Sequence, residues 1–261
     1  MKNFLDKKFL QYNSKNFIET DPIQIPHKFS RREDIEIAGF LTAIIAWGQR
    51  KTIISNAEYL MDILDNEPHE FVIGAKACDL AKISKFVHRT FNGDDCLYFI
   101  HSLQNIYTRH NGLKTLFEEG YQKFNDIKPA ISYFREIFFE LPYLQRTCKH
   151  IADVNKNASA KRINMFLRWM IRKDNSGVDF GLWDKIPMSA LYMPLDVHSG
   201  TVARELGLLT RKQDDWKAVD ELTATLREFD YKDPVKYDYA LFGIGAFEKN
   251  RINSNYFKKG L

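Results

Sequence analysis

Apolar residues recur along most of this chain at the three- and four-residue spacings of an amphipathic helix. Over residues 36–64 the apolar positions keep one face, and the segment Trp47-Gly48-Gln49-Arg50 interrupts them. The same spacing recurs over 126–141, and the clearest stripe runs over 163–171. This periodicity indicates helices, and few stretches alternate in the way that strands do. The pattern therefore predicts an all-α fold, with a break between two helices at residues 47–50.

Helix boundary signals refine this picture in the second half of the chain. Asp196 precedes one apolar segment and is expected to cap its helix, which Gly207 is expected to end. Asp233 followed by Pro234 has the pattern of a helix cap and first helical residue, and predicts a helix over 235–247. Residues 175–181 are expected to form a loop, and with the segment 182–187 that follows they separate the helix that begins near Lys161 from the helix of Asp196.

Length and composition bound the class of protein. The chain has 261 residues, of which 44% are hydrophobic and 28% charged, which suits a globular, soluble protein of one large domain or two small lobes. No apolar run is long enough to span a membrane, and the first residues lack the apolar core of a signal peptide, so we expect a cytoplasmic protein. Three distant cysteines, Cys78, Cys96 and Cys148, favour neither a disulfide framework nor a metal site.

Charge is unevenly distributed along the chain. The net charge is +4, but residues 142–173 contain eight basic residues against a single acidic one, Asp153. The basic residues are Arg146, Lys149, Lys156, Lys161, Arg162, Arg168, Arg172 and Lys173. Such a stripe would attract a phosphate backbone, although a solvated helix face has the same pattern.

Lys161 and Asp196 are the residues most suggestive of chemistry, because each stands at the start of an expected helix. A neutral lysine amine can attack a sugar carbon, and an aspartate can accept its proton and stabilise the developing cation. The alternatives are a lysine that contacts phosphate or solvent, and an aspartate that only caps its helix. If the chemistry is real, the two side chains must lie close together in the folded chain.

Three stretches of the chain resemble, in the same order, the helix-hairpin-helix (HhH-GPD) superfamily of DNA base-excision glycosylases. They are residues 36–49, the Lys161 hairpin with the Asp196 helix, and residues 237–246. The gap of 35 positions between Lys161 and Asp196 is similar to that of the archaeal 8-oxoguanine glycosylase branch, and the chain looks like a bacterial family within the superfamily. The hairpin departs from the family pattern, because Asn157 and Ser159 stand where glycines are usual. The resemblance implies an all-α glycosylase fold over residues 1–261, with two lobes around a cleft and the hairpin near residues 153–173.

The resemblance also implies a set of site residues and partners. Lys161 and Asp196 would be catalytic. DNA contacts would come from Lys156, Asn157, Ser159, Arg162 and His198. The base pocket would contain Trp47, Gln49, Met165, Asp238 and Phe242. Trp169 and Trp183 are expected in the core, and Arg204 is expected to pair with an acidic neighbour. The expected partner is double-stranded DNA with a damaged base, bound by a monomer that needs no metal and no iron–sulfur cluster, since no cysteines follow Gly245.

The sequence leaves three functions open. The first is a bifunctional glycosylase and AP lyase that removes an oxidised purine such as 8-oxoguanine by attack of Lys161 at C1′. The second is a non-catalytic DNA-binding protein on the same scaffold, in which Lys161 only holds phosphate. The third is a nucleotide- or RNA-processing enzyme that reuses the base pocket.

Overall fold

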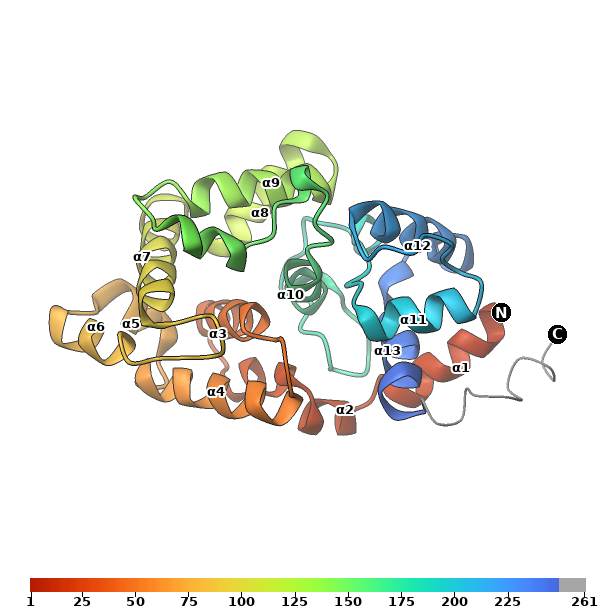
Figure 1. The fold of residues 1–261 in the computed structure, drawn as a ribbon, viewed down its shortest axis with the longest axis horizontal. Coiled ribbons are helices and arrows are strands. Elements are labelled where there is room, and N and C mark those ends of the chain that lie inside the picture. Colours follow the sequence, from red (N-terminus) through yellow and green to blue (C-terminus); the bar gives the residue numbers. More distant parts are fainter. Residues whose placement is uncertain (249–261) are drawn as a thin grey trace. The chain divides into compact units, whose positions relative to one another are not determined.

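The computed structural model describes residues 1–248, and over this range the chain is all-α, without a β-strand. It divides into two compact units (Figure 1). Unit 1 comprises Met1–Phe17, Lys156–Gly181 and the described residues from Pro187 onward, and unit 2 comprises Ile18–Asn155 and Leu182–Ile186. Each unit is therefore assembled from segments that are distant in the sequence.

Unit 2 is a helical assembly whose core is rich in aromatic rings. Phe40 lies at its centre, with its ring centroid 6.0 Å from that of Phe99 and 5.7 Å from that of Phe134. Trp183 is buried against Phe117, and its indole N–H donates to Glu36 at 2.9 Å, so its predicted place in the core is confirmed. The helices of this unit and its borders are α2 Lys15–Thr20, η1 Pro22–Gln24, η2 Pro26–Lys28, α3 Arg32–Ile44, α4 Arg50–Ile63, α5 Pro68–Gly74, α6 Ala77–Ile83, α7 Gly93–Arg109, α8 Gly112–Phe124, α9 Ile127–Phe138, η3 Gln145–His150 and η4 Val154–Lys156.

Unit 1 carries the residues of the predicted lysine–aspartate pair. Its late helix α13 packs against both α1 and α11. Glycine permits one of these approaches, because a Cβ at Gly243 would lie 2.2 Å from the ring of Tyr12. The helices of this unit are α1 Lys2–Tyr12, α10 Lys161–Ile171, η5 Met188–Ala190, α11 Val197–Glu205, α12 Trp216–Phe229, η6 Pro234–Lys236 and α13 Tyr237–Phe247.

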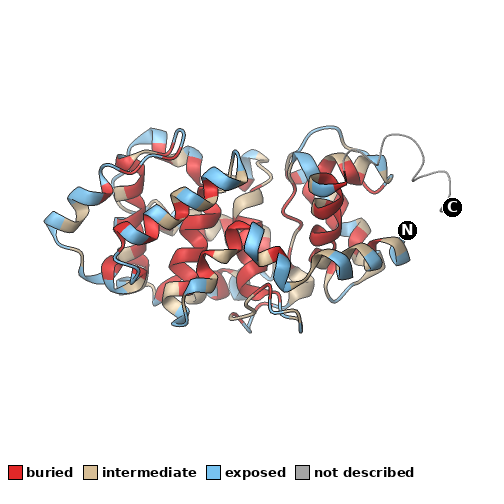
Figure 2. Cartoon of the chain, turned by 90° about the horizontal axis from the view of Figure 1, so that it is seen from below, coloured by how far each residue is buried: buried red, intermediate tan, exposed pale blue. Residues whose placement is uncertain are grey.

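The expected helices follow the apolar pattern closely. The stretch 36–64 forms α3 and α4 with the predicted break, where Gly48 has φ +106°. Residues 163–171 of α10 are all buried, Trp169 included, and buried positions elsewhere gather where helices of one unit face each other (Figure 2). Burial of these amphipathic faces is the main source of stability for helices of this length.

The helix start predicted at Asp233 and Pro234 is confirmed in position, but its first turn is a 3-10 helix and the expected side-chain cap does not form. Asp233 caps no helix with its side chain, residues 234–236 form the short η6, and α13 begins only at Tyr237. The carboxylate of Asp233 instead accepts from Arg172 at 3.0 Å. A charged partner competes successfully here with the backbone N–H groups that a cap would satisfy.

None of the helices described has both the length and the apolar character needed to cross a bilayer. The three cysteines are free thiols, and Cys96 is buried, which raises the pKa of its thiol.

Candidate functional site

Lys161 and Asp196 meet in unit 1. The Lys161 Nζ lies 3.6 Å from Asp196 Oδ2, and both side chains are about a quarter exposed, at 25% and 23%. The proximity that the sequence predicts is therefore confirmed. The pair is open enough for a substrate to reach the amine, and close enough for the carboxylate to take up a proton from it through a small movement.

Asp196 is held in a fixed direction by the start of α11. Its Oδ1 accepts the backbone N–H groups of His198 at 2.9 Å and Ser199 at 3.0 Å, and the Ser199 hydroxyl accepts the Asp196 N–H in return. This reciprocal arrangement is a capping box, and it confirms the predicted cap. Because Oδ1 is occupied by the cap, Oδ2 is the oxygen that faces Lys161.

The turn that precedes Lys161 is held by α12. Asn157 has φ +64° and donates its side-chain N–H to Asp215 Oδ2 at 2.8 Å, while its carbonyl accepts the Trp216 N–H at 3.0 Å. Asn157 thus supports the left-handed conformation that a glycine would otherwise supply. The second left-handed residue is Ala160, with φ +49°, rather than Ser159. Ala160 directly precedes Lys161, so the chain turns sharply into α10.

A buried ion pair lies beside the site. Arg168 Nη1 contacts Asp238 Oδ2, and Arg168 Nε donates to Asp179 Oδ1 at 3.3 Å. Burial raises the pKa of Asp238 to about 6, since desolvation outweighs the attraction of Arg168. The charges of Asp196 and Lys161 also act on Asp238. The site is therefore an electrostatically coupled group of side chains from α10, α11 and α13.

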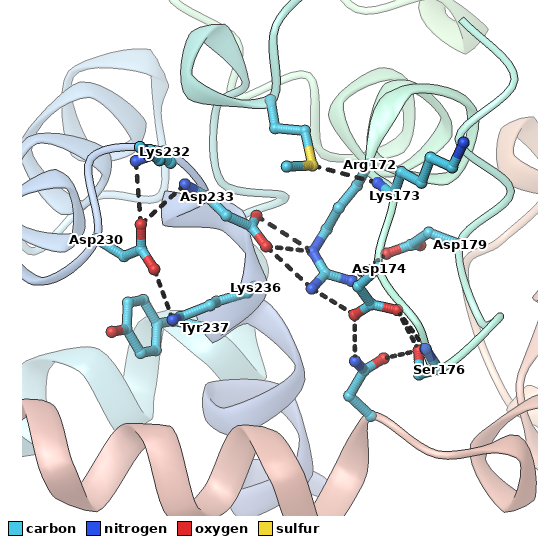
Figure 3. Close-up of polar contacts among 12 residues, drawn as sticks. Arg172, Lys173, Asp174, Ser176, Asp179, Asp230, Lys232, Asp233, Lys236 and Tyr237 are labelled. Carbon is cyan, nitrogen blue, oxygen red and sulfur yellow. Dashed lines mark hydrogen bonds and ion pairs between the residues drawn. The ribbon is translucent and has the colours of Figure 1, made fainter. Parts of the chain in front are cut away.

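Arg172, one turn after Arg168, joins three carboxylates, one of which is Asp179 again (Figure 3). It donates to Asp233, to Asp179 at 2.9 Å and to Asp174 at 2.7 Å. Burial alone would lower the pKa of Arg172, but the surrounding carboxylates raise it above its ordinary value. Burial also raises the pKa of Asp233, whereas hydrogen bonds from Ser176 and the charge of Arg172 lower that of Asp174 to about 2. This network ties α10 to the loop after it and to η6.

The predicted base-pocket residues fall into different surroundings. Met165 is buried on α10, and the carboxylate of Asp238 is already bound by Arg168. Phe242 is partly exposed, and its ring stands edge-on to that of exposed His198, with centroids 6.3 Å apart. Trp47 and Gln49 belong to unit 2, where the Trp47 ring stacks on that of His150 at 5.9 Å. Phe242, which lies beside His198, and Asp238, on which the charges of Asp196 and Lys161 act, are thus the candidates near the pair, and the pocket roles of all five stay predictions.

The predicted basic stripe is corrected at two positions. Arg168 and Arg172 are buried and bound by carboxylates, so neither can meet a phosphate backbone. Their amphipathic helix turns these two guanidiniums inward, which a linear count of charges cannot show. Among the predicted DNA contacts, Lys156 and His198 are exposed and Ser159 is partly exposed. Arg162 is partly buried, and burial lowers its pKa to about 10. Arg204 pairs with Asp214 at 2.6 Å, as predicted.

The sequence analysis missed Asp174, Asp179 and Asp215, and it assigned Asp233 and Asp238 to roles other than partners of the buried arginines. Arg168 and Arg172 follow Lys161 and Met165 at helical spacing, and this repeat of polar residues on a buried stripe is a signal of buried ion pairs. No comparable signal marks Asp179 or Asp215, because their partners are reached through tertiary structure. Among residues 1–248 there is no group of three or more His, Cys, Asp or Glu side chains that could hold a metal ion.

Fold and site together define an all-α protein with a lysine–aspartate pair at two helix starts. A family model matches residues 21–247, and the chain belongs to this family, which is described as a protein of unknown function (DUF2400). The matched range includes both members of the pair. No curated protein and no solved structure matches the chain.

Proposed function

We infer that this protein is a DNA base-excision glycosylase with AP lyase activity. The observation that carries the proposal is the 3.6 Å approach of the Lys161 amine to a carboxylate whose other oxygen is fixed by a helix cap. The resemblance of the chain to the helix-hairpin-helix glycosylases supports the same conclusion. The proposal includes their two-lobed fold, a monomer acting in the cytoplasm on double-stranded DNA, and no iron–sulfur cluster.

The chemistry follows from the two side chains. Lys161 Nζ gives a proton to Asp196 Oδ2 and attacks C1′ of the damaged nucleotide, while the bond from C1′ to the base breaks and the base leaves with a proton. The departing base takes its proton from Asp196, and the regenerated Asp196 carboxylate offsets the positive charge on the sugar and on the attached nitrogen. Ring opening then gives a Schiff base between Lys161 and the sugar, from which strand cleavage follows by β-elimination. The target nucleotide must first leave the stack, because C1′ is not accessible in a duplex.

The partly exposed ring of Phe242 beside His198 supports a stacking contact with the extruded base. Exposed His198 and Lys156 are the contacts that we propose for the phosphates on either side of the base. An oxidised purine such as 8-oxoguanine is the proposed substrate, on the basis of the long gap between the catalytic residues.

A panel of duplexes that each carry one lesion, read by strand cleavage and by borohydride trapping, tests the proposal. The wild type should cleave and be trapped on an oxidised purine. Lys161→Gln should lose both, and Asp196→Asn should lose roughly 100-fold in rate while its helix stays capped. Lys217→Gln, which changes an exposed lysine on α12 of the same unit, should match the wild type.

Two outcomes distinguish the alternatives. Tight duplex binding without cleavage of any lesion would identify a non-catalytic DNA-binding protein. Stronger competition by free nucleosides or single-stranded RNA than by duplex DNA would identify a nucleotide- or RNA-processing enzyme.

A further inference from the structure

An exposed aromatic surface lies on unit 2, in the segment that links α9 to η3. Its most prominent residues are Tyr143 and Leu144, which are 43% and 55% exposed. The ring centroid of Tyr143 lies 4.9 Å from that of Phe139 and 6.0 Å from that of Tyr98. Tyr98 and Phe139 are themselves stacked, with centroids 5.7 Å apart. Tyr143 is therefore the most exposed ring of a cluster of three.

This cluster is firmly attached to the fold. The Tyr98 hydroxyl donates to the carbonyl oxygens of Phe138 at 2.8 Å and Leu141 at 3.3 Å, so α7 holds the chain where it leaves α9. Tyr98 itself is buried, and Phe139 is partly exposed. The ring of Tyr143 thus has a fixed support and is still open to solvent. A ring that is held in advance loses little conformational entropy when a flat ligand stacks on it.

The charges around the exposed ring are basic. Residues 141–152 contain Arg146 and Lys149 but no acidic residue. Lys149 is exposed and forms no ion pair with any other residue of 1–248. The guanidinium of Arg135 lies over the ring of Phe139, 5.0 Å from its centroid. The surface therefore favours an anionic ligand.

The two cations of this segment differ in what they can bind. Arg146 donates to Asn92 at 2.7 Å and lies 3.2 Å from the buried carboxylate of Asp95, which offsets its charge. Lys149 has no such partner, so it is the cation that remains available for a phosphate. Both residues belong to the basic stripe of the sequence, and neither has a role in the lysine–aspartate site.

An exposed aromatic ring next to a cation is the combination that binds single-stranded nucleic acid, because bases stack on the ring and cations follow the backbone. A stable protein partner would cover roughly 800 Å² of the surface, which is a large area for a patch with two exposed apolar side chains. One ring is sufficient to stack one base. The size and the charge of the patch therefore both favour a nucleic-acid strand.

We propose that the surface formed by Tyr143, Leu144 and Lys149 binds an unpaired stretch of DNA, with a base stacked on Tyr143 and a phosphate at Lys149. Within a duplex the faces of each base are covered by its neighbours, so the ring finds no base to stack on. The surface therefore prefers single strands. This inference rests on the proposed function only for the choice of DNA over RNA, since the ring and the lysine can bind either.

Fluorescence anisotropy with labelled single-stranded DNA, and with a duplex of the same length, measures the preference. Tyr143→Ala should weaken single-strand binding by roughly tenfold and leave duplex binding unchanged. Tyr143→Phe keeps the ring and should match the wild type. Tyr231→Ala, which removes a 73% exposed tyrosine of unit 1, is the matched control and should also match it. Lys149→Gln should reduce the salt slope of single-strand binding by about 0.7, the value for one lost phosphate contact.

Photocrosslinking locates the contact in the wild-type chain and does not depend on how a variant folds. Single strands that carry 5-iodouracil are irradiated with the protein, and the crosslinked peptide is sequenced by mass spectrometry. The adduct should fall on Tyr143. Crosslinks only at other residues, no binding of single strands by the wild type, or unchanged single-strand affinity in folded Tyr143→Ala would overturn the inference.

Two comparisons separate this inference from its neighbours. Tighter binding of single-stranded RNA than of DNA with the same base sequence would overturn the choice of DNA. Lys161→Gln should bind single strands as the wild type does, because the surface is independent of the amine. A wild type that is never trapped on any lesion, but whose single-strand binding depends on Tyr143, would refute the proposed glycosylase and leave this surface standing.

Discussion

Replacing Arg172 with methionine tests the buried network that holds α10 in place. The side chain of Arg172 is 1% exposed and donates to three carboxylates, with Nε bound to Asp233, Nη1 to Asp179 and Nη2 to Asp174. Methionine fills much of the volume but supplies no donor and no charge. The substitution therefore leaves the carboxylates in place and removes the cation between them.

The cost can be worked out from the partners that remain. Asp179 keeps Arg168, and Asp174 keeps two hydrogen bonds from Ser176, so these carboxylates are only partly deprived. Asp233 loses its guanidinium partner in a buried setting that already raises its pKa. Breaking a buried pair on one side typically costs 3–5 kcal/mol, so we expect a loss of about 4 kcal/mol at pH 7. At pH 5 the deprived carboxylates take up protons, and the loss should shrink by at least about 1 kcal/mol.

Urea denaturation followed by circular dichroism measures the loss, and hydrogen exchange of peptides from α10 and α13 assigns it to unit 1. Arg31→Met is the control, because it removes only an exposed ion pair with Glu70 and should change the free energy of unfolding little at either pH. A loss below about 1 kcal/mol for Arg172→Met at pH 7, or a loss equal at both pH values, would refute this reasoning.

Three further predictions follow from the same contacts. The folded-state pKa of Asp238 is about 6 and exceeds that of a free aspartate, because burial disfavours the charged form. The protonated carboxyl therefore stabilises the fold below about pH 4, and this contribution is lost as the pH rises through 6. In urea titrations the free energy of unfolding of Asp238→Asn, relative to that of the wild type, should rise over this window by on the order of 2–3 kcal/mol. Asp215→Ala should destabilise unit 1 by about 2 kcal/mol in thermal melts, since it removes both the α12 cap and the bond from Asn157, whereas Asp215→Asn should keep the cap. Duplex affinity should fall steeply with salt, and Lys156→Glu should weaken all sequences alike in fluorescence anisotropy; a flat salt titration would contradict a phosphate-based interface.

Local patterns in the sequence were sufficient for most of the helices. The break between α3 and α4, the extent of α10 and the cap at Asp196 all depend on residues within a few positions of each other. The proximity of Lys161 and Asp196 could be predicted because each marks a helix start, and the family resemblance linked the two starts.

Interactions between distant segments explain what the sequence analysis missed. The local sequence predicts that the Asp233 side chain caps a helix, but in the structure its carboxylate accepts a hydrogen bond from Arg172, 61 positions earlier. The sequence pattern predicts that Arg168 and Arg172 are surface charges, but the loop after α10 brings Asp179 into contact with both of them. Ala160 takes the left-handed position because α12 anchors the preceding turn through Asn157, a contact that no local propensity encodes.

The most direct test of the central claim is to identify the amine that reacts with DNA. Wild-type protein is incubated with an 8-oxoguanine duplex and borohydride, the covalent adduct is digested, and the modified peptide is sequenced by mass spectrometry. The account predicts a single adduct on Lys161, whose Nζ lies 3.6 Å from Asp196 Oδ2. An adduct on any other amine, or no adduct on this duplex or on any other lesion of the panel, would contradict it.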